Sequence, residues 1–237
     1  MKSLSILYYH EIVANGKGYS FQMTEIDKFE QQMKYLSENG YKTILFSQLN
    51  QPIDRKTVLV SFDDGYLSVY ENAVPILKKY GIKGNVYLPT GLIGSKANYM
   101  NWDMINSLYK SGCFDFATHS HSHCDITKLS FTQLLTEFEE CDRIFLKNLG
   151  FKSNLFCIPY GHYNRETVKN IWKTKKYEYV TTSYYGQIGK KVPKNRLLPR
   201  IPVSNDDSMD VFISKLKGKY NLTGYKQRLK NFIRNGK

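Results

Sequence analysis

Long hydrophobic runs are missing from this sequence of 237 residues, and cysteines are few. Its apolar stretches stay well short of the roughly 18 residues that suggest a membrane-spanning helix, so no such helix is predicted. The cysteines contain no C-x-x-C pair and are widely spaced, at Cys113, Cys124, Cys141 and Cys157. A disulfide framework or a structural zinc site is therefore not expected, and we predict four reduced thiols.

The N-terminus also lacks the features of an export signal. The apolar stretch within residues 1–10 is too short for the middle region of a signal peptide, and no small-residue cleavage site follows it. We expect this stretch to form a first buried strand. We also expect a cytoplasmic location, and peripheral association with the membrane is compatible with it.

Acidic residues are scarce relative to basic ones. The chain has 21 Asp and Glu against 34 Lys and Arg, which gives a formal net charge of +13 at pH 7. This excess predicts attraction to an anionic glycan or an anionic lipid surface, with a nucleic acid less favoured, although solubility alone also explains it. Residues 211–237 form a basic tail with eight Lys or Arg and no acidic residue. Its apolar residues suggest a helix docked on the body of the protein rather than on a membrane; they are Tyr225, Leu229, Phe232 and Ile233.

Apolar runs and amphipathic stretches alternate along the whole chain, which is typical of βα units. Strands are predicted near residues 4–9, 41–46, 57–62, 84–88, 114–118, 155–158, 179–182 and 197–201, with helices between most of them. The first helix is expected to be capped by Thr24. No internal repeat or linker is visible, so we predict one α/β domain over residues 1–237, a barrel of seven or eight βα units. Such a barrel carries its functional groups at the carboxyl ends of its strands.

Two adjacent acids follow the strand predicted at 57–62. Asp63 and Asp64 precede Gly65, and an Asp-Gly step after a strand is often only a turn. Two neighbouring carboxylates repel each other, however, and this cost is better tolerated when a cation binds one and leaves the other free to act as a base. From this segment alone, both interpretations remain open: a simple turn and a catalytic pair of carboxylates.

Histidines are rare, yet three of the five lie between positions 119 and 123. A solvated loop is the simple alternative to a site. His119 and His123 are four residues apart, so a single turn of chain can direct both imidazoles at one ion, and His121 then points elsewhere. One carboxylate and two imidazoles, with further positions for water, suit Zn²⁺ or another first-row ion such as Co²⁺, Ni²⁺ or Fe²⁺.

Together these segments resemble the signature of the polysaccharide deacetylases of the NodB-homology type, carbohydrate esterase family 4. The S-F-D-D-G at 61–65 matches that family's T/S-F-D-D-G segment, and H-S-x-x-H at 119–123 matches its H-S/T-x-x-H segment. F-C-I-P-Y-G at 156–161 resembles the third segment of the branch that acts on poly-N-acetylglucosamine. The opening Tyr9-His10 and residues 29–41 resemble that branch as well, so the resemblance covers residues 1 to about 203, with its motif core at about 55–203. It implies a distorted (β/α)7–8 barrel.

The resemblance also implies a role for each matched residue. Asp63 is the general base, and the metal is held by Asp64, His119 and His123. The backbone N–H of Tyr160, in a turn fixed by Pro159, stabilises the oxyanion together with the metal. A divalent cation would lower the pKa of bound water from about 15.7 toward 7, so that an acetamide can be hydrolysed at neutral pH.

Two departures from the family pattern concern proton transfer. Many members have an arginine two residues before the proline to orient the catalytic carboxylate, where this chain has Cys157. Arg200 is our candidate replacement, and we group it with the substrate-binding residues. Many members also take their general acid from a late histidine, whereas here no histidine follows His162. We expect His10, at the end of the first strand, to supply that proton; a structural histidine at the barrel rim is the alternative.

Aromatic side chains that flank the motifs are the candidates for sugar binding, because sugar rings are often held against such groups. They are Tyr66, Tyr160, Tyr163 and Trp102. The function predicted from the sequence is a metal-dependent N-deacetylase that releases acetate from an N-acetylated amino sugar in an oligosaccharide, polysaccharide or surface-glycan precursor. An amidase on a non-sugar C–N bond and a non-catalytic glycan-binding protein on the same barrel are the alternatives.

Overall fold

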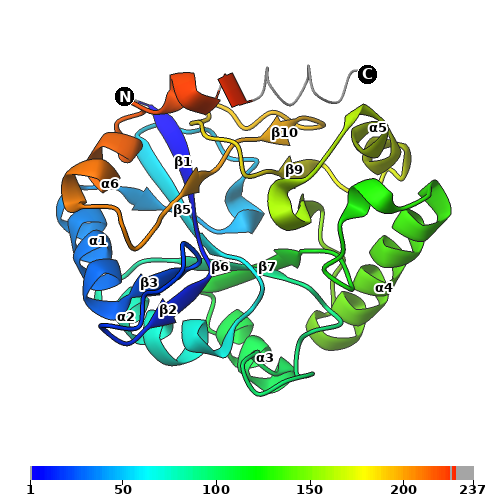
Figure 1. Ribbon diagram of the computed structural model, residues 1–237, viewed down its shortest axis with the longest axis horizontal. Coiled ribbons are helices and arrows are strands. Elements are labelled where there is room, and N and C mark those ends of the chain that lie inside the picture. Colours follow the sequence, from blue (N-terminus) through cyan, green and yellow to red (C-terminus); the bar gives the residue numbers. More distant parts are fainter. Residues whose placement is uncertain (1, 225, 228–237) are drawn as a thin grey trace.

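Parallel strands form a curled sheet, and helices surround it (Figure 1). The computed structural model describes residues 2–224 together with 226 and 227. Within them nine strands join the main sheet in the order β10-β9-β8-β7-β6-β5-β1-β11, with β4 also paired to β5. Their bounds are β1 Ser3–Tyr9, β4 Lys42–Thr43, β5 Lys56–Phe62, β6 Gly84–Leu88, β7 Phe114–Thr118, β8 Leu155–Cys157, β9 Tyr179–Thr181, β10 Leu197–Leu198 and β11 Ile201–Pro202. This sheet confirms the distorted barrel that the sequence predicts.

A small second sheet and a set of helices complete the fold. Strands β2 (Glu11–Val13) and β3 (Met23–Glu25) pair with each other beside the carboxyl end of β1. In Figure 1 the helices follow one another around the outside of the strands. They are α1 Ile26–Glu38, α2 Val74–Lys79 after a π turn at Val69–Ala73, α3 Trp102–Lys110, α4 Phe131–Leu149, α5 Arg165–Lys173 and α6 Met209–Leu216. None of the described helices is long and apolar enough to cross a bilayer.

Three local predictions are corrected by the structure. Thr24 does not cap α1, because it is buried within β3 and the cap position falls on Glu25. The strand predicted at 41–46 is paired over Lys42–Thr43 alone, since β6 takes over the same edge of β5 farther along. The strand predicted at 197–201 is two short strands: β10 pairs with β9 and β11 with β1, and Arg200 stands in the gap between them.

Side chains alternate between the inside of the barrel and the helix layer, as the period of two residues in a strand requires. In β1, Leu4 and Ile6 belong to the cluster inside the barrel, whereas Leu7 and Tyr9 pack with the surrounding helices. The same alternation in β5 puts Leu59 inside, so Asp63, four residues later, continues on the inner side. The apolar interior is thus capped by polar groups at the carboxyl ends of the strands.

The basic tail is described only in its first part. Residues 211–216 belong to α6, which packs on the body of the protein through Phe212 and Leu216. The apolar residues that the sequence predicts on one face of a terminal helix lie outside the described residues; they are Tyr225, Leu229, Phe232 and Ile233.

Candidate active site and metal centre

The residues singled out in the sequence come from separate loops that meet at the carboxyl ends of the strands. Asp63 and Asp64 follow β5, His119 and His123 follow β7, and Arg200 lies between β10 and β11. These residues are spread over 138 positions of the sequence, from 63 to 200. Because the strands of the main sheet are parallel, their carboxyl ends all lie on one side, and this brings the residues together.

Asp64, His119 and His123 form a compact set of metal-ligand groups. One ligand atom from each lies within 4.8 Å of the others. Asp64 Oδ1 is 3.0 Å from Nε2 of His123 and 3.5 Å from Nε2 of His119. Asp64 and His119 are buried and His123 is partly exposed, so the set is closed on its inner side and open toward the cavity.

This set fits a metal ion for two reasons. Asp64 Oδ1 is buried, yet it has no hydrogen-bond partner among the described residues. Nδ1 of His119 lies 2.8 Å from the carbonyl oxygen of Cys157, and because a carbonyl only accepts, Nδ1 must carry the proton. With Nδ1 engaged in this way, Nε2 is the ring atom left to bind an ion, and it faces the Asp64 carboxylate at 3.5 Å, an arrangement that a cation would stabilise. The residues present therefore suit a divalent ion.

The loop between the two histidines is not a helical turn, although the spacing of four residues is that of one. Ser120 and His123 both have left-handed backbone, with φ of 63° and 56°, and Ser120 Oγ accepts a hydrogen bond from the backbone N–H of His123. His121 points away from the set, and its Nδ1 lies 3.0 Å from Thr90 Oγ1. Asp64 (φ 71°) and Tyr160 (φ 57°) are also left-handed, so strained backbone concentrates at this site.

Asp63 is held by Arg200 in a buried two-point ion pair. The guanidinium nitrogens Nη1 and Nη2 lie 2.7 Å and 2.9 Å from the two carboxylate oxygens, and the exposed fractions are 3% for Asp63 and 2% for Arg200. Nε of Arg200 donates to the carbonyl of Thr182 at 2.8 Å, which fixes the plane of the fork. Burial alone would raise the pKa of the Asp63 carboxyl, but the charge and hydrogen bonds of Arg200 outweigh burial and hold that pKa below its ordinary value.

Arg200 thus contacts Asp63 in the way expected of our candidate replacement for the arginine that is missing at Cys157. Its guanidinium also stacks over the ring of Tyr8, 4.2 Å from the ring centre. Both ends of the fork contact Asp63, so Arg200 positions that carboxylate, and Arg200 also lines the cavity. Its grouping with the substrate-binding residues stays a prediction.

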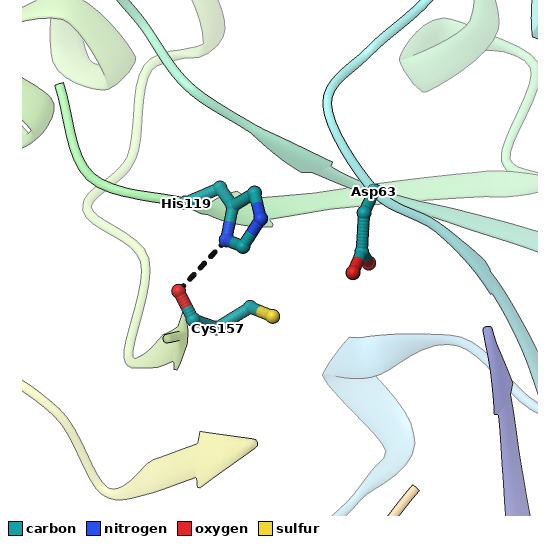
Figure 2. A group of neighbouring side chains, drawn as sticks. All are labelled: Asp63, His119 and Cys157. Atoms are coloured by element: carbon teal, nitrogen blue, oxygen red, sulfur yellow. Dashed lines mark hydrogen bonds between the residues drawn. The ribbon is translucent and has the colours of Figure 1, made fainter. Parts of the chain in front are cut away.

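A second cluster of ligand types lies next to the first. Asp63, His119 and Cys157 also have ligand atoms within 4.8 Å of one another, and Figure 2 shows their side chains converging on the same interior space. Both oxygens of Asp63 are already engaged by Arg200. Burial raises the pKa of the Cys157 thiol, which keeps it protonated. Asp64 with the two histidines is therefore the better candidate set for a metal ion, and the carbonyl of Cys157 orients His119 within it.

His10 faces the same cavity from the end of β1. Its Nε2 lies 4.0 Å from Asp63 Oδ2, and its side chain is 13% exposed. Burial lowers the pKa of the imidazole, while the charge of Asp63 opposes this shift. A lowered pKa makes the protonated ring a stronger acid.

The cavity at this site has a volume of about 270 Å³. Of the predicted substrate contacts, Tyr160 lines it and is 59% exposed, with its ring 4.8 Å from that of His123. Pro159 is buried and begins the turn that carries Tyr160. Tyr66 stacks on Tyr99 beside the metal set rather than lining the cavity.

Trp102 and Tyr163 are placed differently from the prediction. Trp102 packs against the core beside Phe145, and Tyr163 packs against the cluster beneath α4 and α5, so neither lines the cavity. Trp102 is the first residue of α3 and Tyr163 lies just before α5, and at these positions both side chains pack against apolar clusters. The structure adds lining residues that the sequence did not indicate: Tyr8, Phe21, Gln22, His162 and Ser183. Phe21 is 71% exposed although it is a large apolar residue. This exposure marks it as a candidate substrate contact, but it can be seen only once the fold is known.

Comparison with known proteins agrees with this geometry. The family model described as polysaccharide deacetylase matches residues 50–180, which include the loop of Asp63 and Asp64 and the loop of His119 and His123. The chain belongs to the polysaccharide deacetylase family. This confirms the family, and with it the class of carbohydrate deacetylases, that the sequence motifs predict.

Individual relatives of this deacetylase-family chain are similar at moderate identity. YxkH of Bacillus subtilis (strain 168), a presumed polysaccharide deacetylase, is 31% identical over 186 residues, which are 76% of this chain and 64% of YxkH. The poly-beta-1,6-N-acetyl-D-glucosamine N-deacetylase of Staphylococcus aureus (strain MSSA476) is 27% identical over 236 residues, covering 90% of this chain and 78% of that protein. The crystal structure of BC0361, a polysaccharide deacetylase from Bacillus cereus, superposes with a TM-score of 0.80 at 24% identity, over 90% of this chain and 69% of that one.

Proposed function

We propose that this protein is a metal-dependent N-deacetylase that hydrolyses the acetamide of an N-acetylated amino sugar in a glycan and releases acetate. The observation that carries the proposal is the pairing of two carboxylates with opposite surroundings: Asp64 faces two imidazoles, and Asp63 is held ionised by Arg200. Membership of the family and similarity to a protein named as a poly-N-acetylglucosamine deacetylase support the class of substrate.

Asp64, His119 and His123 would hold the ion, and we propose Zn²⁺ because two imidazoles and one carboxylate with open positions suit it. When bound, the ion would supply an acidified water and polarise the acetamide carbonyl. Asp63 accepts the proton of the attacking water, since Arg200 keeps its carboxyl ionised. Arg200 also prevents rotation of that carboxylate, so the accepting oxygen stays at the cavity wall.

His10 supplies the proton that the departing amine needs. Its ring faces the cavity on the side of Asp63, and its Nε2 is the closest imidazole nitrogen to Asp63 Oδ2 outside the metal set. The backbone N–H of Tyr160 is the proposed oxyanion donor, because the left-handed conformation at this residue turns the chain sharply at the cavity wall.

Acetate release from oligosaccharides of N-acetylglucosamine tests the proposal directly. The wild-type protein with Zn²⁺ is expected to release acetate, and a chelator should stop it. Asp63→Asn should lower turnover by at least about 100-fold, as expected for a general base, while its metal content stays that of the wild type. His10→Asn should behave in the same way; near-normal turnover of that variant would remove His10 from the mechanism.

The chemical alternative has a distinct result. An enzyme that releases no acetate from any acetylated sugar, yet hydrolyses cyclic or linear non-sugar amides in a Zn²⁺-dependent manner, would contradict the proposed substrate and leave the proposed metal set intact.

A further inference from the structure

Basic residues gather at the end of the barrel that is opposite the cavity. Because the strands of the main sheet are parallel, the segments that lead into them lie at that end. The segment at 217–219 joins them, since Lys217 lines one hollow with Ser3 and Lys56 at the starts of β1 and β5. We call this surface the basic end; it comprises residue 2 and residues 39–42, 51–56, 80–83, 110–113, 150–154, 174–178, 189–196 and 217–219.

The basic end accounts for the whole net charge of the protein. It contains fifteen Lys or Arg and two acidic residues, Asp54 and Glu178. Its formal charge of +13 equals that of the entire chain, so the remaining residues sum to zero. The segments that follow the strands, around the cavity, have four Lys or Arg and six acidic residues; they are 10–22, 63–68, 89–101, 119–130, 158–164, 182–186 and 199–208. Charge is thus separated along the barrel axis.

Most of these cations are exposed and lack an acidic partner. Among the described residues, four of the fifteen form ion pairs: Lys42 with Asp54, Lys152 and Lys176 with Asp142, and Lys194 with Glu178. The other eleven have no carboxylate within ion-pair distance in the described part of the chain. Solubility alone would be served equally by an even distribution, so the one-sided arrangement calls for a partner at this end.

The composition of the basic end favours a lipid surface as that partner. Thirteen of its fifteen cations are lysines, and the two arginines are Arg55 and Arg196. Lysine is a flexible point charge that suits diffuse attraction to a charged plane, whereas polyanion grooves favour the planar fork of arginine and stacked aromatic rings. The cations also come from all around the barrel end rather than from one strand or helix.

We propose that the basic end docks electrostatically on a membrane that contains anionic lipids, and that docking holds the mouth of the active site facing away from the bilayer. Each lysine near such a surface contributes roughly a fivefold factor to partitioning. The attraction falls off within a Debye length, so it is lost at high salt. The orientation follows from the fold, because the two ends of the barrel are opposite each other.

Binding to vesicles tests the proposal. The full-length protein should sediment with vesicles of phosphatidylcholine and phosphatidylglycerol, and not with phosphatidylcholine alone. Binding should disappear toward 1 M salt, where the Debye length is about 3 Å. A triple variant with Lys190→Glu, Lys191→Glu and Lys217→Glu should lose at least about 100-fold in vesicle affinity. All three side chains are exposed and have no ion-pair partner among the described residues.

A matched variant separates the basic end from net charge. Lys17→Glu, Lys96→Glu and Lys169→Glu change the total charge equally, but these exposed lysines lie near the cavity or on α5. This variant should keep most of the vesicle affinity. Equal losses in the two variants, or no binding to anionic vesicles at all, would overturn the proposal. The proposal would also be overturned if the basic-end variant lost binding to heparin or duplex DNA but kept its binding to vesicles. Matching circular dichroism spectra and melting temperatures exclude misfolding as the cause of a loss.

The orientation has its own readout in Cys113. This free cysteine is exposed and lies within the basic end, whereas the other three are buried or half-buried. A fluorophore on Cys113 should be quenched by spin-labelled lipid in anionic vesicles. In a Cys113→Ser background, a fluorophore on Ala14→Cys, in an exposed loop near the cavity, should escape quenching. Stronger quenching at position 14 than at 113 would reverse the proposed orientation and so overturn it.

Discussion

At the scale of single residues, the pairing of Asp63 with Arg200 decides what the site can do. A carboxylate that is 97% buried would ordinarily be neutral, and a neutral acid cannot accept a proton. Two charge-assisted hydrogen bonds, at 2.7 Å and 2.9 Å, reverse that tendency. The ionised carboxylate that the proposed mechanism uses as its base therefore depends on a residue 137 positions away in the sequence.

Replacing Arg200 should show this dependence in the pH profile. Arg200→Gln leaves burial unopposed, so the pKa of the Asp63 carboxyl should rise above its present lowered value. Because the proposed mechanism requires the ionised form, activity should then be lost at a higher pH on the acidic limb than in the wild type. Turnover measured against pH checks this, and an unshifted acidic limb would show that Arg200 does not set the ionisation of Asp63.

Stability gives a second measurement on the same pair. Arg200→Gln leaves a buried charge without a partner, which typically costs about 3–5 kcal/mol of unfolding free energy. Asp63→Asn combined with Arg200→Gln removes both charges and should recover part of that loss. Denaturant unfolding of the two single variants and the double variant measures the coupling; additive losses would contradict a direct interaction.

At the scale of secondary-structure elements, helix α4 holds the loop that carries His119 and His123, the proposed metal ligands. Glu137 projects from the first half of α4 and accepts hydrogen bonds from the backbone N–H groups of His121 and Ser122, both at 2.9 Å. Its other oxygen accepts from Ser122 Oγ at 2.8 Å. The loop needs such support because Ser120 and His123 have left-handed backbone, which is costly without external contacts.

Removing the charge of Glu137 should therefore weaken metal binding without touching a ligand. Glu137→Gln replaces one acceptor oxygen by an amide donor opposite N–H or O–H groups, and loss of such outer support typically lowers metal affinity about 10–100-fold. Glu139→Gln is the matched control, since Glu139 is an exposed residue of the same helix with no ion pair among the described residues. Competition of Zn²⁺ with a chelating dye measures both affinities, and equal values would rule out the role of Glu137.

The strands that lead to the site could be predicted from the sequence, whereas the contacts of helix α4 could not. The strands before Asp63 and His119 are apolar runs of residues that favour strands, so their ends, and the chemistry there, could be read directly. Glu137 appears in sequence as one more polar position of an amphipathic helix. Its partners are 15 and 16 residues away and depend on how α4 packs, so periodicity carries no information about them. The same holds for Trp102, which lies between two motif segments in sequence and packs against the core.

At the scale of the whole molecule, the barrel was predictable because each βα unit repeats an apolar strand followed by an amphipathic helix. The break in the sheet between β10 and β11 was not predictable. The sheet is interrupted at Pro199 and Arg200, where a short strand was expected to continue. That gap is where Arg200 enters the interior. A proline has no N–H for a ladder hydrogen bond, which fits a break in the sheet here. The sequence offered Arg200 as a candidate to orient the catalytic carboxylate, but it did not show the gap through which Arg200 reaches the interior.

Metal binding should stabilise the entire fold, because the ligands come from two loops that are brought together only in the folded chain. At a Zn²⁺ concentration of about 100 times the dissociation constant, the expected gain is about 2.7 kcal/mol. For a domain of this size that corresponds to a rise in melting temperature of about 5–10 °C. Thermal unfolding with and without Zn²⁺ measures it. Asp64→Asn should lose most of the rise, whereas His121→Asn should keep it, since His121 lies between the two ligands in sequence and points at Thr90 instead. A rise that survives in Asp64→Asn would mean that Zn²⁺ binds elsewhere.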